Sequence, residues 1–163
     1  MNSELPDCIE INPSGDPAAV IIWLHGLGAD GHDFEAIVPE LHLPDTLPVR
    51  YVFPHAPMRA VTINGGVVMR AWFDIFDVEL TADSIDLDQF RESVGMLTAL
   101  IENEMQSGMA SDRIILAGFS QGGAIVLHTG LHYDKQLAGI LAMSMHLPTI
   151  TQSASAFSAA GQQ

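Results

Sequence analysis

Residues 114–123 read Ile-Ile-Leu-Ala-Gly-Phe-Ser-Gln-Gly-Gly, and the local pattern of this segment is the clearest in the sequence. It begins as a short apolar run, passes through the turn Gly118-Phe119-Ser120-Gln121-Gly122, and continues at once into a segment with helical composition. An apolar run that ends in a glycine-rich turn and restarts as a helix is typical of a strand-to-helix connection. We therefore expect a buried strand, a sharp turn at Ser120 and a helix that starts directly after the turn.

The Gly-X-Ser-X-Gly spacing also indicates a chemistry. In a nucleophile elbow, the serine occupies a strained turn and its hydroxyl stands out from the sheet at the N-terminus of the next helix. The two glycines allow the backbones of strand and helix to approach closely, and the helix N-terminus favours developing negative charge. The hypothesis is that Ser120 is a nucleophile. The competing interpretation is an ordinary strand-to-helix turn with a small buried serine.

Apolar runs elsewhere predict further strands. Residues 20–24 form a continuous apolar run, as expected of a central parallel strand covered on both faces. Residues 8–11 alternate and predict an edge strand, and the runs at 49–53 and 137–144 predict two more strands. Helical composition predicts three helices, at residues 33–43, 86–106 and 121–133. Alternating strands and helices indicate an α/β fold with a mostly parallel sheet and right-handed crossovers.

The clearest helical pattern covers residues 86–106, where apolar residues recur at steps of three and four. Asp86 with Gln89 resembles a capping box, and Gly108 marks the end of the helix. In the expected helix at 33–43, Pro39 must kink the helix or limit it to a first turn.

The stretch from Met58 to Phe76 has no clean period and contains Asn64-Gly65-Gly66. It predicts a long functional loop. Trp72, within this loop, either lines a substrate pocket or caps the core.

Composition narrows the classes of function. The 163 residues, 48% hydrophobic, suit one globular domain, and the net charge of −14 argues against nucleic acid and anionic membranes as partners. Cys8 is alone, the N-terminus lacks a signal-peptide pattern, and no uninterrupted run of 18 apolar residues predicts a membrane span. We expect a cytoplasmic protein. No cluster has metal-ligand spacing, so neither metal nor cofactor is expected.

A glycine-rich turn, residues 25–31, follows the strand expected at 20–24. Its spacing matches neither the P-loop nor the dinucleotide fingerprint, and no lysine follows, which argues against phosphate binding. A strand followed by His-Gly is instead where serine hydrolases of the α/β type place a second oxyanion donor. His25 is a candidate base, but a structural, hydrogen-bonding role is favoured.

Several separated motifs carry a resemblance to one family. They are Trp23-Leu24-His25-Gly26-Leu27-Gly28, Pro54-His55-Ala56-Pro57, Thr62-Ile63-Asn64-Gly65-Gly66, Trp72-Phe73-Asp74 and Gly118-Phe119-Ser120-Gln121-Gly122-Gly123. In this order they resemble the phospholipase/carboxylesterase family of α/β hydrolases, which includes bacterial carboxylesterases and acyl-protein thioesterases.

The resemblance implies an α/β-hydrolase fold, a mostly parallel sheet with helices on both faces. It also implies roles for residues. Ser120 would be the nucleophile, the backbone N–H groups of Leu27 and Gln121 would form the oxyanion hole, and Trp72 would border the acyl pocket. The implied substrates are carboxylic esters or thioesters.

The sequence departs from the family pattern after Leu147-Pro148. The family places its acid after the next strand and its base in a Gly-His segment near the C-terminus, and residues 149–163 contain neither. We expect residues 1–148 to form the N-terminal two-thirds of the hydrolase domain, C-terminally incomplete and lacking the last strands. The Ser-, Ala- and Gln-rich residues 149–163 predict a disordered tail.

Two hypotheses follow. In the first, the chain is a serine carboxylesterase or thioesterase whose activity is residual, unless His146 acts as a surrogate base. His146 follows the strand at 137–144 and is the best placed of the seven histidines, although a solvated histidine is the simpler interpretation. In the second, the chain is a catalytically silent hydrolase fragment that acts as a binding or assembly module. The exposed edge of the strand at 137–144 would then favour self-association.

Overall fold

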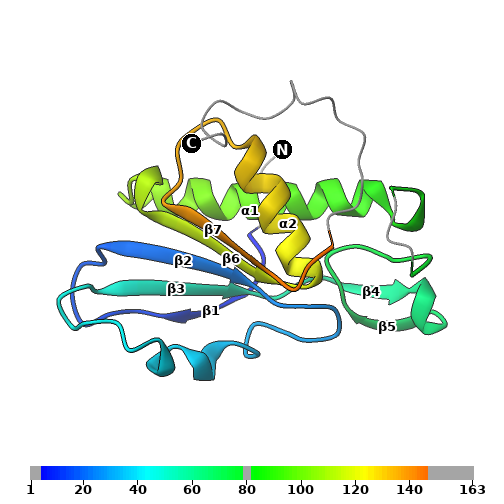
Figure 1. The fold of residues 1–163 in the computed structure, drawn as a ribbon, viewed down its shortest axis with the longest axis horizontal. Helices are drawn as coiled ribbons and strands as arrows, with labels where there is room; N and C mark the ends of the chain where they lie inside the picture. The colour runs from blue at the N-terminus through cyan, green and yellow to red at the C-terminus, as the bar shows by residue number, and fades with distance from the viewer. Residues whose placement is uncertain (1–4, 79–81, 147–163) are drawn as a thin grey trace.

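The computed structural model describes residues 5–78 and 82–146. A five-stranded sheet forms its centre, with the strands in the order β1-β3-β2-β6-β7 (Figure 1). The strands are β1 (Cys8–Ile11), β2 (Ala19–Leu24), β3 (Val49–Pro54), β6 (Ile114–Phe119) and β7 (Gly139–Met143). The expected tail at 149–163 lies outside the described residues.

The sheet is mostly parallel, as the sequence predicts. Strand β2 pairs in parallel with β3 and β6, and β6 pairs in parallel with β7. Only β1 runs antiparallel, along the free side of β3, which confirms the predicted edge strand. The continuous apolar run of β2 is explained by its central position, because both of its faces are covered.

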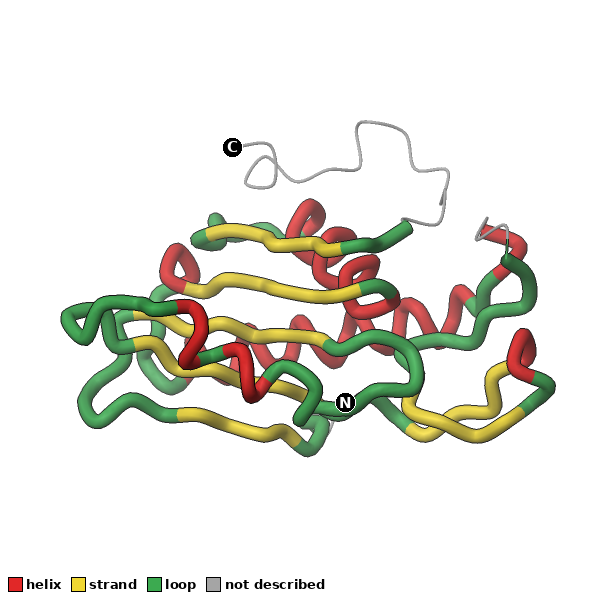
Figure 2. Tube along the Cα trace, turned by 60° about the horizontal axis from the view of Figure 1, so that its bottom comes forward, coloured by secondary structure: helices red, strands yellow, loops and turns green. Residues whose placement is uncertain are grey.

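Both long helices, α1 (Leu87–Gln106) and α2 (Gln121–His132), lie on the same face of the sheet (Figures 1 and 2). They enclose the larger hydrophobic cluster with the side chains that β2, β3 and β6 direct to this face. On the opposite face, the segment between β2 and β3 covers a smaller cluster, where Trp23 stacks on Phe34 with ring centroids 5.0 Å apart.

The predicted helix at 33–43 is wrong in type. The segment forms two short 3-10 helices, η1 (Glu35–Ile37) and η2 (Pro39–Leu41). Pro39 occupies the first position of η2, where its missing N–H is tolerated, so it divides the segment into two turns. His42 then adopts a left-handed conformation with φ of 48° and ends η2.

The helix at 86–106 is confirmed, but only half of its capping box forms. The Asp86 side chain caps α1 by accepting the N–H groups of Asp88 and Gln89. The Gln89 side chain does not return to the N-cap. It accepts the N–H of Asp74 at 2.8 Å, and the Asp86 N–H donates to the carbonyl oxygen of Asp74. Tertiary contacts therefore replace the reciprocal half of the motif.

The predicted long loop at 58–76 is wrong in its first part. It forms a small antiparallel sheet of β4 (Met58–Val61) and β5 (Val67–Arg70), which lies beside the carboxyl end of the large sheet (Figure 1). Gly65 and Gly66 make its turn with positive φ. Residues 72–74 do lie outside regular structure. The remaining 3-10 helices are η3 (Thr62–Asn64), η4 (Ala82–Ser84) and η5 (Ser111–Arg113).

Two glycines permit the closest backbone contacts around β6 and α2. A Cβ on Gly118 would lie 2.5 Å from the carbonyl oxygen of Gly122. A Cβ on Gly122 would lie 2.5 Å from the carbonyl oxygen of His25 and 2.6 Å from that of Leu24. Because these neighbours are backbone atoms, they cannot rotate away. Residues with a side chain at either position would force strand, helix and loop apart.

This packing predicts opposite effects for the same substitution at two helical sites. We expect Gly122→Ala to lower the free energy of unfolding by about 1–3 kcal/mol, because the new methyl group overlaps backbone. Gly95→Ala in α1, where nothing lies within 4 Å of the added Cβ, should raise it by about 0.5–1 kcal/mol through helix propensity. Urea unfolding of both variants checks this. A stabilised Gly122→Ala variant would contradict the proposed close approach.

Candidate active site

Ser120 occupies a strained turn between β6 and α2. Its backbone has φ of 51° and ψ of −118°, a combination that costs a residue with a side chain on the order of 1–3 kcal/mol. The Ser120 N–H donates to the carbonyl oxygen of Met143 at 2.9 Å, which ties the turn to β7. Ser120 is partly exposed, and among the described residues its hydroxyl group makes no hydrogen bond. This geometry is that of a nucleophile elbow.

The sheet topology opens a crevice next to this turn. Strands β2 and β6 are neighbours, and Leu24 at the end of β2 is paired with Gly118. Beyond these residues, the chain leaves β2 towards the face that carries η1 and η2, whereas it leaves β6 for α2 on the other face (Figures 1 and 2). Such a topological switch point is where α/β proteins bind their ligands.

A pocket of about 90 Å³ lies at this crevice. Its lining brings together four residues that the sequence analysis selected for separate reasons: Ser120, Leu27, Gln121 and His146. Leu27 comes from the loop after β2, Ser120 and Gln121 from the elbow, and His146 from the segment that follows β7. They come from three chain segments because the carboxyl ends of neighbouring parallel strands meet at one edge of the sheet.

Two backbone donors at the pocket have no acceptor. The hydrogen bonds of the described residues leave the N–H groups of Leu27 and Gln121 unpaired, whereas one neighbour of each is paired. Gly28 N–H donates to the carbonyl oxygen of Arg70 at 2.9 Å, and Ser120 N–H to that of Met143. Gln121 is also the first residue of α2. The positive end of the helix dipole therefore lies at this N–H and adds to the attraction for an anion. The arrangement can hold a developing oxyanion.

His25 has a structural role in this geometry. Its ring is 1% exposed, Nε2 accepts the N–H of Ala56 at 3.0 Å, and Nδ1 lies 2.7 Å from the carbonyl oxygen of Gly26. These partners require the neutral ring with its proton on Nδ1. Burial lowers the pKa of His25 below its ordinary value, which favours the same neutral form. Both nitrogens are occupied, so the ring holds the loop that carries Leu27.

Trp72 lies in the core and does not line the pocket. It is 1% exposed, and its Nε1–H donates to the carbonyl oxygen of His25 at 2.9 Å. The pocket wall is formed instead by Phe73 and Ile75, together with Ala124 of α2. The sequence analysis missed these three residues. Phe73 and Ile75 were detectable only as apolar neighbours of Trp72 in an irregular stretch, a signal that does not distinguish pocket from core.

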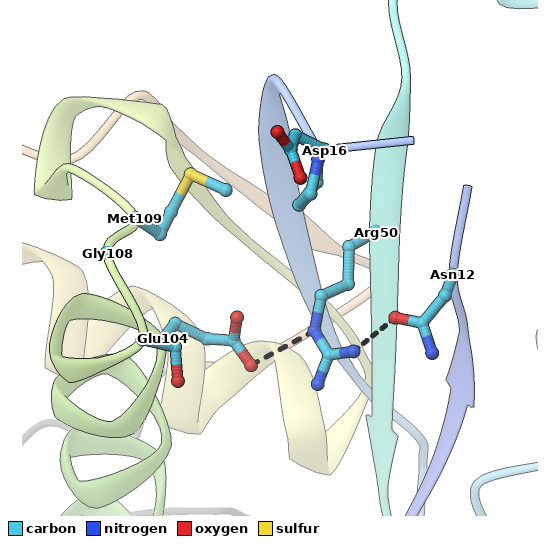
Figure 3. A pocket seen from close by; sticks show the side chains of 8 residues that line it. Asn12, Asp16, Arg50, Glu104, Gly108 and Met109 are labelled. Atoms are coloured by element: carbon cyan, nitrogen blue, oxygen red, sulfur yellow. Dashed lines mark hydrogen bonds and ion pairs between the residues drawn. The ribbon is translucent and has the colours of Figure 1, made fainter. Parts of the chain in front are cut away.

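A second cavity, of about 460 Å³, lies at the opposite end of the sheet (Figure 3). The Arg50 side chain extends across it and is paired on several sides: Nε lies 3.3 Å from Glu104, Nη2 lies 2.9 Å from Glu10, and Nη1 donates to Asn12. Arg50 thus joins β3 to β1 and to the end of α1. Since its hydrogen-bonding groups already have partners, we assign this cluster a structural role.

Within residues 5–78 and 82–146, no group of three histidine, cysteine or acidic side chains is arranged to hold a metal ion. No helix in the described part of the chain is long and apolar enough to span a bilayer.

Comparison with known proteins places this geometry in a family. The family model described as phospholipase/carboxylesterase matches residues 7–163. Acyl-protein thioesterase 1 of Schizosaccharomyces pombe is 39% identical over 150 residues, which cover 91% of this chain and 65% of that protein. Acyl-protein thioesterase 1 of Neurospora crassa is 38% identical over 136 residues, or 79% of this chain and 55% of that protein.

Solved structures agree with this assignment. Arabidopsis thaliana SOBER1 superposes with a TM-score of 0.79 at 34% identity, covering 88% of this chain and 69% of that one. Esterase PE8 gives a TM-score of 0.73 at 26% identity and covers 94% of this chain and 69% of that one. The chain spans 55–65% of the length of the two curated relatives. It belongs to the phospholipase/carboxylesterase family of α/β hydrolases.

Proposed function

We propose that this chain supplies the nucleophile and the oxyanion hole of a serine hydrolase that cleaves carboxylic esters or thioesters. Ser120 Oγ attacks the acyl carbonyl carbon, and the carbonyl oxygen becomes an oxyanion held by the N–H groups of Leu27 and Gln121. The bond to the alcohol or thiol then breaks, and the leaving group takes up the serine proton. Water attacks the resulting acyl-serine, which releases the carboxylic acid and restores the hydroxyl group.

One observation carries this proposal. A serine in a strained backbone conformation shares a pocket with two unpaired backbone N–H groups on different segments. Strain of this kind persists only where the surrounding structure maintains it, and N–H groups beside a pocket that have no protein partner are available to a ligand. An acyl group whose carbonyl oxygen lies between the two N–H groups satisfies both.

The choice of substrate class rests on the relatives and on the pocket. The curated relatives named above are acyl-protein thioesterases, which supports thioesters beside esters. The pocket of about 90 Å³ is small for a ligand site, which suits a short acyl chain. Its lining beside Ser120 is apolar, from Leu27, Phe73, Ile75 and Ala124.

His146 is the proposed base. It is the one histidine among the residues that line the Ser120 pocket, and it is exposed there. No hydrogen bond joins it to Ser120 Oγ within the described residues, but such contacts are often long before substrate binds. We propose that neutral His146 accepts the Ser120 proton during attack and returns it to the leaving group.

The location of the protein is a separate matter. A cytoplasmic location stays a prediction from the sequence.

The alternative function, a catalytically silent binding or assembly module, is favoured by the sheet edge. Among the described strands, β7 pairs only with β6, and Leu141 at its centre is 48% exposed. A strand edge with unpaired backbone groups and an exposed apolar side chain can pair with another chain. The two functions differ in one respect that can be measured directly, the reactivity of Ser120.

We expect the chain to hydrolyse p-nitrophenyl acetate and p-nitrophenyl butyrate faster than Ser120→Ala does, because only the natural chain can form an acyl-enzyme. A fluorophosphonate probe should label the natural chain and leave Ser120→Ala unlabelled, since labelling requires an activated hydroxyl. Hydrolysis at the level of the Ser120→Ala variant, together with no labelling, would refute the enzyme and favour the assembly module.

Replacing the proposed base should affect the rate without affecting the fold. We expect His146→Ala to lower kcat by about 10²–10⁴-fold, the usual contribution of a general base. His32→Ala is the matched control, because the His32 side chain is 59% exposed and does not line the pocket. If both variants retain the natural rate on p-nitrophenyl butyrate, His146 is not the base.

A further inference from the structure

The side chain of Gln121 has a function that the elbow motif does not require. In that motif, the residue after the serine contributes its backbone N–H, and its side chain is free to vary. Here Gln121 is only 5% exposed, and both the oxygen and the nitrogen of its carboxamide make hydrogen bonds. Oε1 accepts the N–H of Trp72 at 2.7 Å, and Nε2 donates to the carbonyl oxygen of Phe73 at 2.7 Å.

These two bonds hold a segment that has no regular structure. Residues 72–74 are buried yet lie in neither helix nor strand. Buried backbone groups need partners, and here side chains supply them. Besides Gln121, the Ser93 hydroxyl donates to the carbonyl oxygen of Trp72, and Gln89 Oε1 accepts the N–H of Asp74 at 2.8 Å. Ser93 and Gln89 belong to α1, whereas Gln121 belongs to α2.

The same segment forms one wall of the Ser120 pocket. Phe73 and Ile75 line it, together with Leu27 from the loop after β2. Gln121 is the only one of the three side-chain partners that also lines the pocket. Its backbone N–H faces the proposed oxyanion, and its carboxamide holds the wall. A single residue therefore sets the distance between the wall and the reacting centre.

We infer that the Gln121 carboxamide is a positioning residue that fixes the Phe73–Ile75 wall over Ser120 and thereby limits the acyl group to a short chain. This inference rests on the proposed hydrolysis at Ser120. The wall has little freedom to withdraw while both hydrogen bonds are intact, because the peptide groups on either side of the Trp72–Phe73 pair are both bonded to the first residue of α2. Without the carboxamide, the Trp72 N–H and the Phe73 carbonyl oxygen lose their partners, so the wall moves or admits water.

Gln121→Met tests the clamp, since methionine has a similar length and no amide. We expect the ratio of kcat/KM for p-nitrophenyl octanoate to that for p-nitrophenyl butyrate to rise about tenfold, mainly through KM, because the loosened wall admits longer chains. Amide hydrogen exchange at Trp72 should become about tenfold faster as local opening becomes easier. Gln106→Met, on the exposed last turn of α1, is the matched control and should change neither quantity.

A second variant covers a failure of Gln121→Met to fold. Gln121→Glu retains an acceptor for the Trp72 N–H but places a carboxylate oxygen against the Phe73 carbonyl oxygen, which repels it, so a change in the same direction is expected. An unchanged chain-length ratio in an active enzyme would overturn the inference. If the natural chain hydrolyses no faster than Ser120→Ala, the proposed function fails. Hydrogen exchange then tests by itself whether the Gln121 carboxamide holds the segment. Unchanged exchange at Trp72 in the folded variants rejects this role, and faster exchange supports it.

Discussion

The structure depends on one close approach between backbones. At the end of β6 the chain turns into α2 so tightly that Gly118 and Gly122 have no room for a Cβ, and Gly122 lies against the carbonyl oxygens of Leu24 and His25. This contact fixes the strained turn at Ser120, and it also presses the elbow against the end of β2. The loop after β2 therefore begins beside the nucleophile, and Leu27 reaches the same pocket as Ser120.

The site lies where helices and strands end. Buried side chains there supply the hydrogen bonds that the irregular backbone lacks. The loop after β2 is held by the neutral ring of His25, which is bonded to Ala56 and Gly26. The irregular segment 72–74, which carries Phe73 of the pocket wall, is held by carboxamides and a hydroxyl group from the two long helices. In a sheet, neighbouring strands pair each other's backbone groups, whereas in a buried loop the backbone groups need side chains as hydrogen-bond partners. Such loops can be shaped to a ligand, since their conformation is set by a few specific contacts.

Charge has a different role at the two ends of the sheet. The chain has 20 acidic and only six basic residues besides histidine. At the end remote from Ser120, Arg50 joins two strands and α1 through carboxylates of Glu10 and Glu104. The lining of the Ser120 pocket contains no aspartate, glutamate, lysine or arginine. An apolar lining beside a few convergent polar groups is the usual character of a pocket that binds an organic substrate.

The five strands of the large sheet, the two long helices and the elbow could be predicted from the sequence, because they depend on local patterns: apolar runs, a 3.6-residue period, and glycines flanking a serine. The sequence also selected Ser120, Leu27, Gln121 and His146, which the fold brings to one pocket. The β4–β5 hairpin and the division of residues 33–43 at Pro39 were not predicted, although both form between residues close in sequence. The bond from Gln89 to Asp74 depends on the tertiary structure, because it joins α1 to a separate irregular segment. The sequence also did not show that Phe73 and Ile75 line the pocket while Trp72 lies in the core. An irregular segment has no period from which the direction of a side chain can be predicted.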